Sequence, residues 1–292
     1  MPEGDTIHTV ARVMRPDLEG QVVVLLEVHQ RPCAWAEGSR ATSVEAVGKH
    51  LVITLEGAFG VRTLRVHLGM KGSWHRYRPG EVWPRPASGR RALIATAEWL
   101  FVCFGPKEVA VGEAFSGDTA GAARARAVGH LGPDLLAGVA AGQGVFAARD
   151  AVERARHPGL AAMAVADVLL TQTVASGIGN VYKSETLFLE RVDPWYPIGA
   201  LDDARLLAIY ERAATLMKVN VEAGGWRTTT RVTASDDVPA AERYWVYRRA
   251  RHPCRVCGAL VRSRLQGPMA RMTYWCPKCQ VHGKVAGSKT AF

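Results

Sequence analysis

The sequence predicts an α+β protein of several domains, in which an N-terminal helix and a β-sandwich precede a helical part and a C-terminal metal-binding β-hairpin. Three observations lead to this prediction. Strand-like segments dominate the chain up to residue 104, helical periodicity dominates two segments after residue 160, and two C-x-x-C pairs lie near the C-terminus. With 292 residues, of which 48% are hydrophobic, the chain is long enough to bury more than one core.

The first helix is expected almost directly after the N-terminus. Its apolar residues follow the i, i+3, i+4, i+7 spacing of one helical face: Ile7, Val10, Ala11 and Met14. Asp5 and Thr6 are candidate caps, and Pro16 is expected to close the helix.

Strand-like segments punctuated by Gly and Pro follow, which favours a β-sandwich or barrel. They span residues 22–28, 50–55, 62–67 and 92–104. Residues 117–143 are rich in Ala and Gly, which is typical of a linker or of weak helices and indicates a domain boundary. Beyond it, helices are expected at 161–173 and at 203–219, the second capped by Asp202 or Asp203.

Four cysteines near the C-terminus form two C-x-x-C pairs separated by an insert of hairpin length: Cys254, Cys257, Cys276 and Cys279. Each pair supplies two thiolates at the corners of a turn, so we expect one structural Zn²⁺ with no open position for a catalytic water. A redox pair or iron–sulfur ligation is the alternative. Cys33 and Cys103 lie far apart and are expected to be free thiols.

The charge distribution favours a polyanionic partner, and nucleic acid in particular. The net charge is +10 and the pI is about 9.6. No Asp or Glu follows Glu242, whereas Arg and Lys continue to occur. No apolar run reaches the roughly 18 to 20 residues of a membrane span, and the N-terminus lacks the features of a signal peptide. We therefore expect a protein of the reducing cytoplasm, with no membrane partner.

A glycine-rich turn lies between the expected helices and contains Gly177, Gly179 and Asn180. Glycines let a backbone turn tightly and approach a phosphate, and the Asn amide can donate to its oxygens. A simple connection between two helices is the alternative interpretation.

Six short motifs carry a resemblance to a known family. They are Met1-Pro-Glu-Gly4, Gly48-Lys-His-Leu51, His67-Leu-Gly-Met-Lys-Gly72, Gly129-His-Leu-Gly-Pro-Asp134, Gly177-Ile-Gly-Asn180 and Tyr274-Trp-Cys-Pro-x-Cys-Gln280. In these motifs and their order, the chain resembles the formamidopyrimidine-DNA glycosylase and endonuclease VIII family of DNA repair enzymes from end to end. The resemblance implies a catalytic β-sandwich domain (1–118), a helix-two-turn-helix DNA-binding domain (119–249) and a C-terminal zinc finger (250–292).

The resemblance implies that Pro2 is the nucleophile, provided that Met1 is removed. A neutral secondary amine can attack the sugar C1′ and form an iminium. An unperturbed α-amino group has a pKa of about 7.7 to 8.0, so only a modest downward shift is needed, and the positive end of the following helix dipole acts in that direction. Without the other motifs, Pro2 would be interpreted as the first residue of a helix.

Glu3 matches the family's acid/base carboxylate; the alternative is an exposed capping carboxylate. The family commonly has a second Glu three positions further on, where this chain has Thr6, so part of that role shifts to Asp5 or is weakened.

The resemblance implies that Lys49 and Arg271 complete the catalytic set and that Met70 binds DNA. Lys49 matches the lysine that contacts the phosphate by the lesion and assists as a general acid. Arg271 matches the arginine that holds phosphates on either side of the extruded nucleotide, and guanidinium geometry suits two phosphate oxygens at once. A solvated surface lysine is the alternative for Lys49. Met70 resembles the wedge that fills the gap left by an extruded nucleotide. The Arg and Phe wedge residues of the formamidopyrimidine branch are not matched around Pro106 to Val109.

These inferences lead to one main hypothesis, a bifunctional DNA glycosylase and abasic-site lyase that acts as a monomer on damaged double-stranded DNA in a bacterial-type nucleoid. The Pro-Glu-Gly start resembles the endonuclease VIII branch, which acts mainly on oxidised pyrimidines. The His-Leu-Gly-Met loop resembles the formamidopyrimidine branch, which acts on oxidised purines such as 8-oxoguanine. A damaged-DNA-binding relative without cutting activity and a generic zinc-ribbon nucleic-acid protein are the alternatives.

Overall fold

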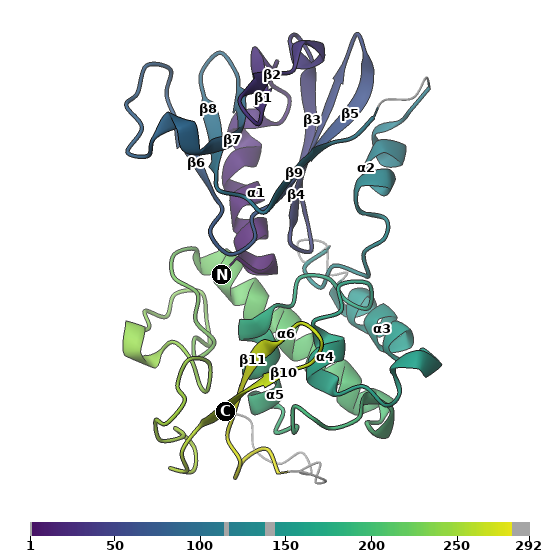
Figure 1. Ribbon diagram of the computed structural model, residues 1–292, viewed down its shortest axis with the longest axis vertical. Helices are drawn as coiled ribbons and strands as arrows, with labels where there is room; N and C mark the ends of the chain where they lie inside the picture. The colour runs from purple at the N-terminus through teal and green to yellow at the C-terminus, as the bar shows by residue number, and fades with distance from the viewer. Residues whose placement is uncertain (1, 114–116, 138–143, 282–292) are drawn as a thin grey trace. The chain divides into compact units, whose positions relative to one another are not determined.

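The computed structural model describes residues 2–113, 117–137 and 144–281. The chain forms two compact units, Met1–His130 and Leu131–Phe292 (Figure 1). This boundary, at residue 130, lies after the one expected at residue 118. The division of the chain into three functional parts remains a prediction.

The first unit is a β-sandwich with one long helix, as predicted. Helix α1 (Gly4–Leu18) runs alongside a five-stranded sheet of order β2-β1-β7-β8-β6 and a four-stranded sheet of order β3-β4-β5-β9 (Figure 1). The strands are β1 (Leu25–Val28), β2 (Arg31–Pro32), β3 (Arg40–Val47), β4 (His50–Gly57), β5 (Gly60–His67), β6 (Ser73–Tyr77), β7 (Arg90–Ala95), β8 (Leu100–Phe104) and β9 (Glu108–Val111). Short 3₁₀ turns at Ala34–Ala36 and Ala87–Gly89 and helix α2 (Ala120–Val128) complete this unit.

The main core of the first unit lies between α1 and the inner faces of the two sheets. Ile7, Leu18, Leu51 and Phe101 are among its fully buried members. Alternate residues of β8 enter this core, and the residues between them belong to a smaller apolar cluster on the other face of that sheet. The free thiol of Cys103 also lies in this core, as expected.

The ends of α1 differ from the prediction. Glu3, rather than Asp5 or Thr6, occupies the N-cap position, because the helix already begins at Gly4. Pro16 does not close the helix, which continues to Leu18. Pro16 removes only one backbone donor, and the burial of Leu18 together with the bond from Glu19 N–H to the Arg15 carbonyl (2.9 Å) retains the last turn.

Two of the expected strands differ from the prediction: one is shorter, and the other is divided into a hairpin. The 22–28 segment is a strand only from Leu25, because its first residues pass between the sheets: Val23 N–H bonds to Ser39, whereas Val24 N–H bonds to Ala95. The 92–104 segment contains β7, a tight turn and β8, paired with each other as a hairpin. In both cases hydrophobicity continues through a change of direction, so periodicity alone does not reveal it.

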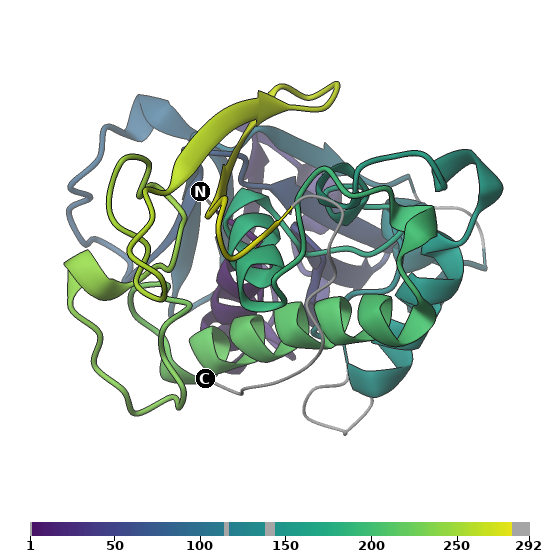
Figure 2. The same cartoon turned by 90° about the horizontal axis from the view of Figure 1, so that it is seen from below.

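The second unit is helical and ends in a β-hairpin. Its helices are α3 (Gly144–Ala155), α4 (Val165–Leu169), α5 (Asn180–Leu189) and α6 (Asp203–Ala223), with 3₁₀ turns at Pro158–Leu160, Ile198–Ala200 and Ala240–Glu242, and its strands are β10 (Arg262–Gln266) and β11 (Arg271–Trp275). The hairpin between the two C-x-x-C pairs was predicted. Figure 2 shows the long helix α6 and the hairpin with β11 against α5.

The predictions for the two long helices have different outcomes. Helix α6 forms as predicted, with the Asp202 side chain accepting the Arg205 N–H (2.7 Å). The 161–173 helix is wrong in extent, since only Val165–Leu169 is α-helical. The side chain of Gln172 bonds to the carbonyls of Leu170 and Ile178, and this local bonding replaces a further helical turn. No helix in the described ranges is long and apolar enough to cross a bilayer.

Candidate functional site

The N-terminus of the first unit places two candidate residues at the start of α1. Pro2 is half-buried, and the side chain of Glu3 is wholly buried. The Glu3 carbonyl accepts the N–H groups of Thr6 (3.0 Å) and Ile7 (3.3 Å), which fixes the first turn. Burial excludes the alternative of an exposed capping carboxylate for Glu3. Met1 lies outside the described residues.

Asp5 is a second buried carboxyl group in the same turn, with 4% of its surface exposed. The Thr6 hydroxyl donates to Asp5 Oδ1 (3.3 Å), and the Thr9 hydroxyl donates to the Asp5 carbonyl (2.9 Å). The position that carries Glu in the family therefore holds a hydroxyl that orients the neighbouring aspartate.

Lys49 lies in the tight turn between β3 and β4, beside two histidines that were not among the predicted site residues. The rings of His50 and His67 lie 4.9 Å apart, on directly paired residues of β4 and β5. Burial lowers the pKa of His50 to about 3, and His67, Arg65 and Lys49 act in the same direction. Burial also lowers the pKa of His67, helped by Lys107 and Lys49. Both imidazoles are therefore neutral near pH 7.

Met70 is exposed at the tip of the loop between β5 and β6, with 67% of its surface accessible. Gly69 adopts a positive φ of 65°, and its N–H bonds to His67 Nδ1 (3.1 Å). A Cβ at Gly69 would lie 2.7 Å from the Lys107 Cβ, so this loop packs tightly against residues 105–107. A large apolar side chain on a braced turn is suited to insertion between bases.

In the second unit, the glycine-rich turn leads directly into α5. Gly177 has a φ of 108° and donates its N–H to Gln172 Oε1 (3.2 Å), and Gly179 is the N-cap residue. Asn180, the first helical residue, donates to the Met272 carbonyl of β11 (2.8 Å). The structure thus brings Asn180 beside the strand that carries the exposed Arg271.

Further polar side chains of α5 hold the hairpin and the chain that precedes it. We call Asn180, Lys183, Ser184 and Glu185 the α5 polar row. The Lys183 ammonium donates to the Thr273 hydroxyl (2.7 Å), and the Tyr274 N–H donates to the Ser184 hydroxyl (3.5 Å). Lys183 and Glu185 have 1% and 0% of their surface exposed, so both ionisable groups depend on internal partners.

Glu185 is the most heavily bonded member of the row. Its carboxylate accepts the N–H groups of Trp245 (2.8 Å), Val246 (2.8 Å) and Tyr247 (2.6 Å), and also the Thr229 hydroxyl. Burial raises the pKa of Glu185 above its ordinary value, and these four bonds, which lower the pKa, offset only part of that rise. The carboxylate fixes the segment that leads from α6 to the C-terminal cysteines.

The four predicted cysteines form one cluster. Their Sγ atoms all lie within 4.8 Å of one another, and Cys254 and Cys276 are buried. Neither close pair is at disulfide distance, since the Cys254–Cys279 and Cys257–Cys276 separations are 3.9 and 3.4 Å. Backbone N–H groups point at two of the sulfurs, from Val256 to Cys254 and from Cys279 to Cys276. Four thiols at these distances fit a tetrahedral metal site, whose sulfur separations are about 3.8 Å for Zn–S bonds of about 2.3 Å.

Comparison with known proteins agrees with this architecture. A family model described as the formamidopyrimidine-DNA glycosylase N-terminal domain matches residues 1–102, and one described as the formamidopyrimidine-DNA glycosylase H2TH domain matches residues 145–232. The "Probable endonuclease 8 2" of Streptomyces coelicolor is 36% identical over 285 residues, which cover 96% of this chain and 94% of that protein.

Two further proteins extend the comparison. The "DNA-(apurinic or apyrimidinic site) lyase Nei2" of Mycolicibacterium smegmatis is 33% identical over 285 residues, covering 96% of this chain and 99% of that protein. The crystal structure of the MutM (Fpg) protein from Thermus thermophilus superposes with a TM-score of 0.69 at 28% identity, covering 97% of this chain and all of that one.

Both family models describe parts of one class of enzyme, the DNA glycosylases that carry an H2TH domain. The chain belongs to the formamidopyrimidine-DNA glycosylase and endonuclease VIII family, a family of DNA glycosylases with abasic-site lyase activity.

Proposed function

We propose that the protein removes oxidised pyrimidines from double-stranded DNA and then cleaves the abasic site through a Schiff base on Pro2. The observation that carries the proposal is the pairing, at one helix start, of Pro2 with the wholly buried carboxyl group of Glu3. A DNA-binding relative without cutting activity would have no need to retain an acid in this place.

The reaction begins once Met1 is removed and the Pro2 nitrogen is neutral. The nitrogen attacks C1′ of the damaged nucleotide, the C1′–base bond breaks, and the base leaves with a proton. Glu3 protonates the ring oxygen O4′, which opens the sugar and gives an iminium between Pro2 and C1′. The positive end of the α1 dipole disfavours an ammonium at Pro2 and so keeps the attacking lone pair available.

Elimination follows from the same iminium. Loss of a proton from C2′ expels the 3′ phosphate, and loss of a second proton, from C4′, expels the 5′ phosphate. Hydrolysis of the remaining iminium frees Pro2, and the DNA is left with a one-nucleotide gap. Asp5, oriented by Thr6, is the second carboxyl group available for these proton transfers.

The binding residues divide by role. We propose that Lys49 and Arg271 contact phosphates on either side of the extruded nucleotide, that Asn180 with the turn at Gly177 and Gly179 contacts the backbone, and that Met70 fills the gap. The four cysteines would hold one structural Zn²⁺, whose coordination sphere they fill, so the metal shapes the hairpin that presents Arg271. We propose that the chain acts as a monomer in three functional parts, 1–118, 119–249 and 250–292.

The preference for pyrimidines is supported by the segment after Pro106. Where the formamidopyrimidine branch has its Arg and Phe wedge residues, the chain turns at Lys107 and enters strand β9, with Glu108 paired to His67. Met70 is thus the exposed apolar residue of this tip. Because the Met70 loop itself resembles the formamidopyrimidine branch, oxidised purines such as 8-oxoguanine are the second candidate substrates.

Borohydride trapping of the untagged protein tests the proposal, with duplexes that carry an abasic site, thymine glycol or 8-oxoguanine. Borohydride reduces an iminium to a stable protein–DNA adduct. We expect adducts on abasic and thymine glycol DNA that disappear in Pro2→Gly and fall strongly in Glu3→Gln. Glu19→Gln, at the exposed end of the same helix, is the matched control and should trap like the wild type. Adducts that persist without Pro2, or DNA binding without any adduct, would refute it.

A further inference from the structure

A packed loop crosses the outer face of the five-stranded sheet in the first unit. Strands β6 and β7 both pair with β8, and residues 78–89 connect them. Trp83 of this loop stacks on Tyr77 at 5.6 Å and meets Phe104 edge to face at 6.1 Å. These aromatic contacts fix the course of the loop over a small apolar cluster on that face.

The loop carries Arg85 to the end of the sheet where the Met70 tip lies. The Arg85 guanidinium carbon is 5.8 Å from the centre of the Phe104 ring. Phe104 pairs with Ser73, the first residue of β6 and the third after Met70. At this end the loop between β5 and β6, which carries Met70, also touches the loop between β8 and β9, since a Cβ at Gly72 would lie 2.9 Å from the Pro106 Cα.

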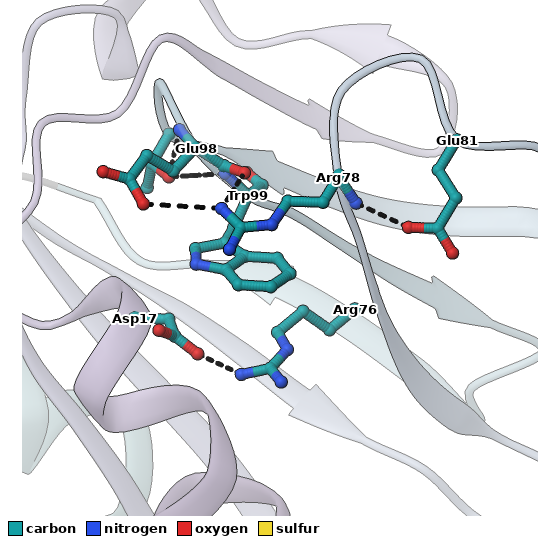
Figure 3. A network of polar contacts seen from close by, with 7 residues as sticks. Asp17, Arg76, Arg78, Glu81, Glu98 and Trp99 are labelled. Atoms are coloured by element: carbon teal, nitrogen blue, oxygen red, sulfur yellow. Dashed lines mark hydrogen bonds and ion pairs between the residues drawn. The ribbon is translucent and has the colours of Figure 1, made fainter.

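The opposite end of the same sheet shows how this protein treats arginines that only stabilise its fold. Arg76 and Arg78 lie on either side of the Trp99 ring, at 4.3 and 3.5 Å from its centre (Figure 3). Each also has an acidic partner: Arg76 pairs with Asp17, and Arg78 lies 3.4 Å from Glu98. Charge and stacking are both satisfied within the protein at this end.

At the Met70 end the exposed cations lack such partners. Within the described ranges, Lys71, Arg85 and Lys107 make no ion pair, and all three are exposed. Glu81, an acid in the same loop, instead accepts the backbone N–H of Arg78 (2.8 Å). Unpaired cations gathered around an apolar tip raise the local positive potential, which fits an anionic polymer that meets the tip.

We infer that Arg85 binds a phosphate of the DNA backbone beside the nucleotide gap filled by Met70. The inference rests on the proposed function, because that function supplies the DNA and the role of Met70. The guanidinium suits two phosphate oxygens, and its position over Phe104 restricts the side chain before binding. The contact carries no base recognition, so it adds affinity without altering lesion preference.

The salt dependence of DNA binding tests the inference. The full-length protein is titrated with a duplex containing a tetrahydrofuran abasic-site analogue between about 50 and 200 mM KCl. Arg85→Gln should bind about three- to fivefold more weakly at the lowest salt, and its slope of log K against log [salt] should be smaller by about 1. Arg85→Lys should keep the wild-type slope. Arg78→Gln, an exposed stacked arginine at the opposite end, should keep both affinity and slope.

The outcomes separate this inference from the function beneath it. A wild type that does not prefer the abasic duplex refutes the proposed function. A wild type that binds, with an Arg85→Gln slope equal to its own, refutes only the role of Arg85. An equal loss in the Lys and Gln variants would assign the effect to packing on Phe104 and would also overturn the phosphate contact. If Arg85→Gln melts at a lower temperature, Arg85→Lys decides, since a reduced slope in that variant contradicts the inference.

Discussion

The two units hold their candidate site residues in different ways. In the first unit, Lys49 occupies the tight turn between the paired strands β3 and β4. Met70 lies in the loop that leads from β5 to β6 of the other sheet, where the Gly69 N–H bonds to His67. In the second unit, Asn180 and Lys183 of the buried α5 polar row bond directly to the strand of Arg271, through the Met272 carbonyl and the Thr273 hydroxyl. Damage to a turn should therefore act locally, whereas damage to the polar row or to the cysteine cluster should disturb several site residues together.

Loss of the metal should give the largest effect and should remain within the second unit. Binding to a structural Zn²⁺ contributes on the order of 10 kcal/mol to the folding of a small domain, so Cys276→Ser should unfold the hairpin and abolish DNA binding. Metal analysis should find one zinc per wild-type chain, and hydrogen exchange should show rapid exchange in residues 254–280 of the variant.

The same hydrogen-exchange measurement tests whether the effect remains within the second unit. Peptides from strands β4 and β5 should keep their wild-type protection, because the described part of the first unit contains no cluster of metal ligands. Loss of protection there would contradict the separation of the two units, and a hairpin that stays protected after chelation would contradict the structural role of the metal.

Glu185→Gln should have the next largest effect. The carboxylate accepts three backbone N–H groups and one hydroxyl, and an amide places its own N–H donors against some of them. We expect the second unit to lose about 2 to 4 kcal/mol of its free energy of unfolding. Urea denaturation gives the loss, and faster hydrogen exchange in residues 228–247 locates it.

An exposed carboxyl group provides the control for this variant. Glu211 lies on the exposed side of α6, and Glu211→Gln should change the stability by less than about 0.5 kcal/mol. Equal stability of the Glu185 and Glu211 variants would show that Glu185 does not stabilise the segment that leads from α6 to the C-terminal cysteines.

Features with a local pattern could be predicted from the sequence, and features that depend on distant partners could not. The cysteine spacing predicted the hairpin, and Asp202 predicted the start of α6, because ligand spacing and capping act over a few residues. The polar row carries no such signal. Lys183 meets Thr273, ninety positions further along the chain, and a lysine inside a helix is ordinarily assigned to the surface.

The site in the first unit shows the same division. The turn at Lys49 and the loop at Met70 were predicted through family motifs, yet the pairing of His50 with His67 depends on strand register. A single sequence with strongly apolar strands does not fix that register. The burial of Glu3 could not be predicted for a related reason, because it follows from the packing of α1 and not from the motif Met1-Pro-Glu-Gly4.

The smallest of these effects tests the first unit through pH. The folded pKa of His50 is about 3, below the ordinary value of 6.5, so the unfolded chain binds a proton more readily. The contribution to stability is therefore complete above pH 6.5 and is lost as the pH falls from there towards 3. Between pH 7.5 and 5 the wild type should lose about 2 kcal/mol of its free energy of unfolding through His50, and His50→Asn should lose that much less.

His75→Asn should remove a smaller part of this pH-dependent loss. Burial and Arg85 lower the pKa of His75 too, but its imidazole is less buried than that of His50. Urea titrations at the two pH values decide the matter, with hydrogen exchange in β4 and β5 as the local readout. A loss that is the same in the wild type and in His50→Asn would mean that the histidine pair can be protonated within the fold, and that the turn beside Lys49 is less rigid than its register indicates.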